Sequence, residues 1–324
     1  MSSGSGLSRA CATLALAATV FAASAQTYPS RPVRLIVPNA PGGPVDSVAR
    51  VLVQNLGSAW GHPLVIENRL GAGGNIGTDA VAKAEPDGYT LLMTPSAPIT
   101  VNVSLFAKVP YDPIRDFAPV TVVYSGPIIL TVPAALPVNS VSDLIAYIRG
   151  RPGQLNYSSA GHGTQPHLAA ELLKQRSRLD VVHVLYRGGP EMTAAVVSGD
   201  VVFNFNGLIA MPLVRAGKLK VLAIAAAKRS TLAPEVPTFA EAGLPGFEVN
   251  AWGGLFAPAR TAQDLVAKLR EDVVKVLSDP AVRARLAGIG VEPIGNSSEE
   301  FAAQIRAEIA HWAQVIKSAG IQVQ

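Results

Sequence analysis

Twice in this chain an apolar strand runs into a turn of glycine and proline that opens directly into a helix. The two segments cover residues 34–53 and 155–173. A helix start leaves its first N–H groups unpaired and carries a partial positive charge, so a turn without bulky side chains can hold a carboxylate or phosphate there. We name the turns the first elbow (Ala40–Gly43) and the second elbow (Ser159–Thr164). Two elbows about 120 residues apart predict a clamp built from two lobes.

The N-terminal segment has the pattern of a secretory signal peptide at residues 1–25. A short polar start with Arg9 leads into an apolar run, which ends at Ala23-Ser24-Ala25. Cleavage there leaves 299 of the 324 residues, with no later apolar stretch of about 20 residues. Cys11, the only cysteine, falls inside this segment, so the mature chain has no disulfide. We expect a periplasmic protein.

The charge balance argues against nucleic acid as a partner. The chain has 27 Lys and Arg against 23 Asp and Glu, a formal net charge of +4. Removing Arg9 leaves 26 basic against 23 acidic residues, an excess too small to indicate nucleic-acid binding. We also expect no cofactor and no metal, and a monomer.

Short apolar runs alternate with helix-like segments along the whole mature chain. This alternation predicts an α/β fold of two lobes, each a mainly parallel sheet flanked by helices. Two apolar segments, Val120–Tyr124 and Ile128–Val132, adjoin at Ser125–Pro127, where we place the first crossing between lobes. The return crossing is expected near Lys228–Thr231. The predicted limits are 26–126 with 230–324 for the first lobe and 127–229 for the second.

The candidate ligand-binding residues cluster at the elbows and at the ends of second-lobe strands. Arg187, in a third elbow, could clamp a second carboxylate or form a surface salt bridge. Asn206 ends a strand and could donate to a ligand or serve as a turn residue. The full set is Ala40, Pro41, Gly42, Gly43, Asp46, Ser96, Ser159, Ala160, Gly161, His162, Gly163, Thr164, His167, Arg187, Gly188 and Asn206.

Several enzyme motifs are missing from the sequence. The tract Gly71–Gly77 has Ile76 where a dinucleotide loop needs glycine, and no G-x-S-x-G elbow occurs in the mature chain. His162 and His167 are five apart, which misses the i, i+4 spacing of a helical zinc pair. His183 carries no motif and is expected to be structural. A secreted enzyme with His167 or Asp46 as general base, or a sensory module, remains an alternative.

With these motifs the mature chain resembles the Bug-type receptors of tripartite tricarboxylate transporters. The segments that carry the resemblance are Tyr28–Pro38, Pro41–Gly43, Glu67–Gly77, Pro86–Leu92, Pro237–Gly246 and Leu255–Pro258. The resemblance implies a two-lobed, Venus-flytrap periplasmic receptor without catalytic activity. It also implies that both elbows hold one ligand carboxylate, partly through water, and that the ligand passes to separate membrane permease subunits.

Two positions depart from the pattern of the family. Family members that bind amino acids resemble one another in having an acidic residue at the position of Asn206. This chain has asparagine there, so the resemblance implies a ligand without an amino group. Gly253, after Trp252, stands where relatives often carry a larger residue. We expect extra room there, enough for an aromatic or longer carboxylate.

Overall fold

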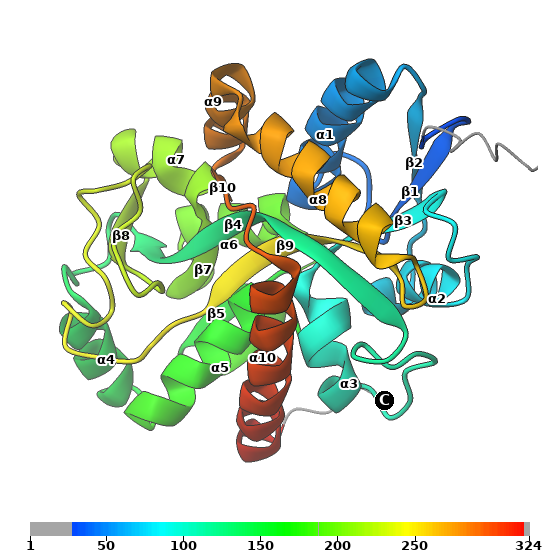
Figure 1. Cartoon of the computed structure of the whole chain (residues 1–324). Helices are drawn as coiled ribbons and strands as arrows, with labels where there is room; N and C mark the ends of the chain where they lie inside the picture. Colours follow the sequence, from blue (N-terminus) through cyan, green and yellow to red (C-terminus); the bar gives the residue numbers. More distant parts are fainter. Residues whose placement is uncertain (1–27, 187, 321–324) are drawn as a thin grey trace, which may run out of the picture.

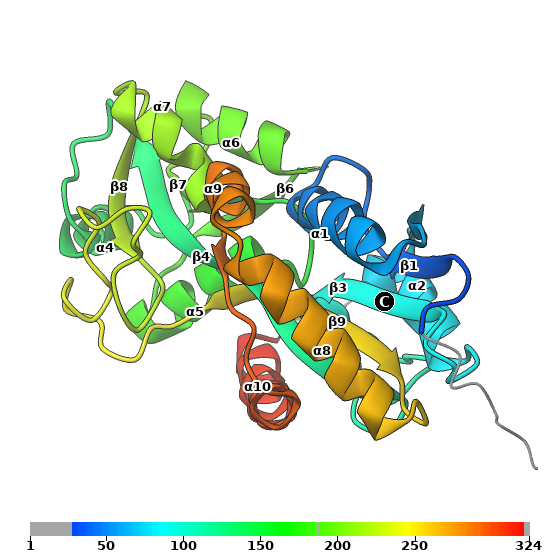
Figure 2. The ribbon, with the colours of Figure 1, turned by 45° about the horizontal axis from the view of Figure 1, so that its top comes forward.

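The structure is a computed structural model that describes residues 28–186 and 188–320 (Figure 1). The predicted signal peptide and Arg187 lie outside these residues. The molecule has two α/β lobes, and strands β4 (Phe117–Pro133) and β9 (Asn250–Pro258) run between them, as both views show (Figures 1 and 2). Among the described residues, no helix is long and apolar enough to span a membrane.

The first-lobe sheet has the strand order β2, β1, β3, β9 and β4. Strand β1 pairs in parallel with β2 and β3, whereas β9 runs antiparallel to β3 and β4. Side chains alternate between the two faces, so Leu35 packs with α1, α8 and α9 while Ile36 packs with α2 and α10. The strand bounds here are β1 (Val33–Val37), β2 (Leu64–Asn68), β3 (Thr90–Pro95) and β10 (Glu292–Pro293), the last pairing with β4.

The second-lobe sheet repeats this plan of parallel strands next to an antiparallel crossing strand. Strand β5 pairs in parallel with β6 and β7, and β4 pairs antiparallel with β7 and β8. The predicted α/β class is confirmed, and each sheet is mixed because β4 and β9 run against the parallel strands. The bounds are β5 (Asn156–Ser159), β6 (Val182–Leu185), β7 (Phe203–Gly207) and β8 (Leu219–Ile224).

Helices connect the parallel strands and cover both faces of the sheets. Helix α1 starts at the first elbow, and α5 and α6 start at the second and third elbows. The bounds are α1 (Pro44–Trp60), η1 (Ala72–Gly74), α2 (Asn75–Ala82), η2 (Ala97–Val101), α3 (Asn102–Leu105), α4 (Val141–Arg149), α5 (Gln165–Ser177), α6 (Gly189–Ser198), η3 (Leu208–Ala210), α7 (Met211–Arg215), α8 (Gln263–Ser278), α9 (Pro280–Ile289) and α10 (Ser298–Ala319).

The two apolar segments that flank Ser125–Pro127 form one continuous strand rather than two. Strand β4 pairs with β9 as far as Pro127 and with β7 from Ile128 onward. The two apolar segments are therefore parts of one strand that has a different neighbour on each side of this point. Gly126 and Pro127 do not break the strand. Its extended backbone continues while its pairing partner changes from β9 to β7.

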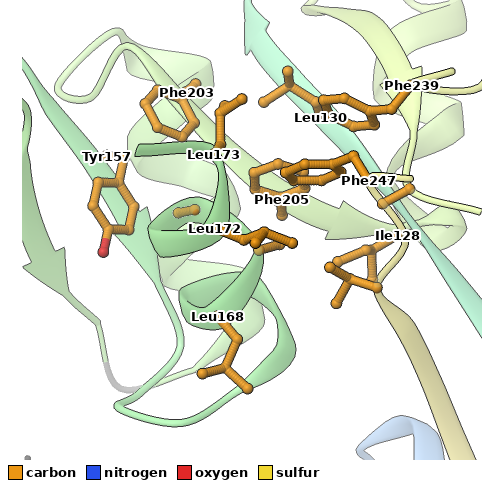
Figure 3. Close-up of a cluster of buried hydrophobic side chains, with 14 of the residues drawn as sticks. Ile128, Leu130, Tyr157, Leu168, Leu172, Leu173, Phe203, Phe205, Phe239 and Phe247 are labelled. Carbon is orange, nitrogen blue, oxygen red and sulfur yellow. The ribbon is translucent and has the colours of Figure 1, made fainter. Parts of the chain in front are cut away.

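The core of the second lobe includes aromatic rings from the segment between β8 and β9 (Figure 3). Phe239 and Phe247 stack on each other with centroids 4.0 Å apart, and both stack against Phe205. The backbone N–H of Val249 also donates to Ala225 O. Because these contacts attach residues 239–249 to the second lobe, we propose that the return crossing lies near residue 250 rather than near 230.

Helix starts follow the sequence signals only in part. At α10, Ser297 and Glu300 form a reciprocal cap. At α8 the cap residue is Ala262, without a side-chain cap, and the Thr261 hydroxyl is buried with no partner among the described residues. Thr261 and Asp264 have the spacing of a capping pair, but this cap does not form because the helix begins one residue later.

Gly253 does not enlarge the cleft. The ring of Tyr124, from β4, lies over it, and a Cβ at Gly253 would be 2.1 Å from Tyr124 Cε1. Trp252 points the other way, where its indole packs edge-on against Phe301 at 5.1 Å and donates to Glu308 at 2.9 Å. The expected extra room is filled by an aromatic side chain on the paired strand.

This packing predicts that Gly253→Ala destabilises the fold. The new methyl group must displace the buried Tyr124 ring, so we expect a loss of about 1–3 kcal/mol in the free energy of unfolding, measured in urea. Gly288→Ala in α9 is the matched control, since a Cβ there meets nothing within 4 Å. We expect that control to gain about 0.5–1 kcal/mol. Wild-type stability in Gly253→Ala would contradict the packing described.

Candidate functional site

The first elbow joins β1 to α1 and leaves its backbone accessible. Gly42 has φ of 83°, in the region that favours glycine, and Gly43 is the residue before the helix, followed by Pro44 at its first position. No side chain caps this helix start. Ala40, Pro41 and Gly42 are exposed. The first N–H groups of α1 therefore face an open turn without partners inside the helix.

Asp46 fixes the shape of the first elbow through hydrogen bonds of its buried side chain. Its side chain is fully buried and accepts from the Gly42 N–H at 2.9 Å, Arg50 Nε at 2.8 Å and Asn68 Nδ2 at 3.0 Å. Burial by itself would raise the pKa of Asp46, but these hydrogen bonds hold that pKa below its usual value. These three hydrogen bonds brace the first elbow.

The second elbow joins β5 to α5 and is held by its own hydroxyl groups. The Ser159 hydroxyl donates to Gly161 O at 3.2 Å and lies 2.7 Å from His183 Nε2, while the Thr164 hydroxyl donates to Gly161 O at 2.7 Å. Gly161 and Gly163 have φ of 145° and 73°. Two positive φ angles within three residues require glycine, so this turn has a fixed shape.

The second elbow also touches the segment between β3 and β4. A Cβ at Gly163 would lie 2.2 Å from Leu105 Cδ2, and Gln165 Nε2 donates to the hydroxyl of Ser96. Ser96 is buried, with 1% of its surface exposed. Ser96 thus lies next to the second elbow as expected for a site residue, with its hydroxyl engaged by α5.

Asn206 lies inside a buried hydrogen-bond network of the second lobe. Its Nδ2 donates to Thr131 Oγ1 at 3.0 Å and to Asn204 Oδ1 at 2.8 Å, and its Oδ1 accepts from Thr193 Oγ1 at 2.8 Å. Both amide hydrogens are therefore used within the protein. Gly188 precedes α6 at the third elbow, whereas its neighbour Arg187 lies outside the described residues.

The structure brings three histidines together beside the second elbow. The ring centroid of His167 is 4.5 Å from that of His183 and 5.2 Å from that of His162. His162 is exposed, as expected of a loop residue, and His167 is buried. His183 was expected to be structural. The parallel pairing of Tyr157 with His183 places it in this cluster, and the sequence alone does not give this register.

Both inner histidines are neutral at pH 7. Burial lowers the pKa of His167 to about 3, and the neighbouring His183, His162 and Lys174 act in the same direction. Burial likewise lowers the pKa of His183 to about 4. Behind them, Tyr157 stacks on His183 at 4.8 Å and donates to Glu171, which also accepts from Lys174 at 2.7 Å.

The glycine tract at residues 71–77 serves packing. A Cβ at Gly77 would lie 2.7 Å from Arg69 O, and one at Gly74 would lie 2.8 Å from Pro98 Cγ. The glycines therefore allow the start of α2 to approach its neighbours closely. This close packing fits the sequence-based exclusion of a nucleotide loop.

Comparison with known proteins identifies the family. The family model of the tripartite tricarboxylate transporter family receptor matches residues 48–321. The chain belongs to this receptor family. BugT of Bordetella pertussis is 37% identical over 315 residues, which cover 97% of this chain and 96% of BugT.

Solved structures of similar proteins confirm the fold. Rpa4515 of R. palustris with adipate is 37% identical, with a TM-score of 0.82 over 91% of this chain and 100% of that chain. MatC of Rhodopseudomonas palustris with bound malate is 36% identical, with a TM-score of 0.78 over 89% and 100%. The predicted family and two-lobed receptor fold are confirmed, and the family and its periplasmic neighbours indicate a periplasmic location.

The bracing of the first elbow predicts a pH-dependent effect of Asp46→Asn. A lowered carboxyl pKa stabilises the native state above the ordinary pKa of about 3.9, and this stabilisation is lost as pH falls through the lowered value. We expect Asp46→Asn to lose about 1–3 kcal/mol in the free energy of unfolding at pH 7 and much less near pH 3.

The exposed Asp200→Asn is the control for this series and should stay within about 0.5 kcal/mol of wild type at pH 7. Urea titrations at several pH values give the comparison. A deficit of Asp46→Asn that is the same at pH 3 and pH 7 would show that the charge of Asp46 does not brace the elbow.

Proposed function

We propose that this receptor captures a small carboxylate between its two lobes, with the two elbows as the clamp. The observation that carries the proposal is the pair of open, glycine-shaped helix starts, one in each lobe. Asp46 holds the first, whose residues Ala40, Pro41 and Gly42 are exposed, and Ser159 and Thr164 hold the second, where His162 is exposed. Helix starts of this kind favour anions, and water can bridge to ligands of different shapes. The similar receptors with adipate and malate support a carboxylate ligand.

We propose binding without catalysis. A general base works best with a pKa near the working pH. Hydrogen bonds hold the pKa of Asp46 low, and burial lowers the pKa of His167 to about 3. Neither group has the proton affinity for base catalysis at neutral pH, which favours the receptor over the secreted enzyme.

We propose that the ligand lacks an amino group. Asn206 has no negative charge to pair with an ammonium group, and Thr131, Asn204 and Thr193 keep its amide within the protein. Asn206 therefore influences ligand choice because it puts no carboxylate at this position to pair with an ammonium group. Gly188, which precedes α6, is proposed to belong to the ligand site, and the role proposed for Arg187 is a clamp on a second carboxylate.

The remaining features of the proposal concern location and delivery. The signal peptide at residues 1–25 would export the chain, and the closed receptor would be recognised as a monomer by membrane permease subunits of a tripartite tricarboxylate-type transporter. Closure requires tighter binding to the closed state than to the open one. The family of the chain supports this pathway.

The ligand class is tested with malate and aspartate, which share one carbon skeleton and differ in a hydroxyl against an ammonium group. We expect malate to raise the melting temperature of the mature protein and aspartate to raise it less. Ligand at 100 times its Kd stabilises by about 2.7 kcal/mol, which gives a readable shift. Asn206→Asp should narrow this difference. Tighter binding of aspartate by the wild type would overturn the proposed ligand class.

The elbow clamp is tested with Gly43→Val. The backbone of Gly43 has φ of −73°, and a Cβ there meets only Ala40 O at 3.5 Å, so the fold should tolerate valine. The added methyl groups would block the open helix start, and we expect carboxylate affinity to fall at least about tenfold in titration calorimetry. Gly288→Ala, remote from the elbows, is the control. Unchanged affinity in folded Gly43→Val would remove the first elbow from the site.

A further inference from the structure

The histidine cluster at the second elbow has the composition of a metal site. One ring nitrogen from each of His162, His167 and His183 can be chosen so that all three lie within 4.8 Å of one another. The rings come from three different elements, namely the elbow itself, α5 and β6. Their approach is therefore a product of the tertiary fold.

We propose that His162, His167 and His183 bind one divalent transition-metal ion of the zinc class, with a fourth position open to water or a carboxylate oxygen. Three imidazoles with an open position suit Zn²⁺, Cu²⁺ or Ni²⁺ rather than Mg²⁺ or Ca²⁺, which prefer oxygen. This site shares the second elbow with the proposed carboxylate clamp, but it uses imidazole side chains where the clamp uses backbone N–H groups.

His183 is oriented as metal-bound histidines usually are. Its Nε2 lies 2.7 Å from the Ser159 hydroxyl, which itself donates to Gly161 O. In the tautomer with the ring proton on Nε2, His183 donates to this hydroxyl and Nδ1 keeps its lone pair for a metal. A donor bond from the second ring nitrogen to a neighbouring oxygen fixes the tautomer in this way. Stacking on Tyr157, with 15° between the planes, fixes the ring plane.

The charged groups behind the inner rings are paired with each other. The Lys174 ammonium, the nearest described cation among the contacts of this cluster, is paired with Glu171 at 2.7 Å. Its charge is therefore compensated, and Glu171 and Tyr157 form a hydrogen-bonded layer behind the rings.

His162 is the ligand that can close the site. Tetrahedral Zn²⁺ with bonds of about 2.0–2.1 Å places its nitrogens about 3.3–3.4 Å apart, so the rings must approach from their present separation. His167 and His183 are held by packing, but His162 is exposed and lies between Gly161 and Gly163. A short rotation of this loop residue brings its ring toward the other two.

Metal binding replaces one hydrogen bond of the second elbow with a bond to the metal. His167 Nδ1 accepts from the Gly163 N–H at 3.1 Å, which keeps the ring proton on Nε2. To bind a metal through Nδ1, the ring must give up this bond, while its proton stays on Nε2. One net hydrogen bond is a small cost beside three metal–imidazole bonds. The released Gly163 N–H then becomes available at the elbow.

The test is titration calorimetry with Zn²⁺ on the full mature chain, made without a histidine tag and treated with chelator. We expect one equivalent to bind and His162→Gln to raise the Kd at least about tenfold. His162 is exposed, so this variant should fold. His167→Gln and His183→Gln should do the same where circular dichroism shows native structure. His311→Gln, on α10, is the control and should bind as wild type.

Cobalt provides an independent readout of the ligand set. Co²⁺ bound by three imidazoles in a four-coordinate site absorbs strongly in the visible range, whereas aqueous Co²⁺ absorbs weakly. We expect the strong bands in wild type and in His311→Gln, and their loss in His162→Gln. No stoichiometric Zn²⁺ binding, or the same affinity in wild type and His162→Gln, overturns the proposal. Carboxylate binding measured in chelator tests the clamp separately.

Discussion

The antiparallel pairing of β4 with β9 is the interaction on which the rest of the structure depends. The pairs extend from Phe117 with Pro258 to Pro127 with Asn250, and β4 then continues into the second sheet. Since one strand belongs to both sheets, each sheet fixes the orientation of the other at this junction. The parallel strands that end at the elbows are added on either side of it. The spacing of the elbows is thus set by main-chain hydrogen bonds far from the elbows themselves.

The two elbows are similar in backbone but differ in how they are held. The first depends on a buried carboxylate, Asp46, whose charge is compensated by Arg50 and by N–H donors. The second depends on neutral groups, with Ser159 and Thr164 closing the turn and His167 holding the Gly163 N–H. Hydrogen-bond donors surround Asp46 and weaken its repulsion of an anion at the first elbow. The described part of the second elbow has no charged side chain. The helix starts therefore dominate the local field.

Much of the fold follows from local sequence, and less of the site does. Apolar runs and glycine–proline turns predict nearly every strand and helix, because each signal lies within a few residues. The cluster around His183 depends on the register between β5 and β6, which no local pattern states. The same holds for Gly253, where the space is taken by Tyr124 from the paired strand. The sequence also predicted that residues 239–249 belong to the first lobe, whereas their phenylalanines pack in the core of the second lobe.

The contact between Gly163 and Leu105 gives the second elbow a property that the first lacks. Leu105 comes from the segment before β4, while Gly163 starts the helix after β5, so the shape of this turn is set from both sides of the lobe junction. Leu105 also belongs to the buried cluster that forms the core of the second lobe. A segment that follows a first-lobe strand in the chain is thereby packed under the turn of the second lobe, and a larger residue at Gly163 would disturb both.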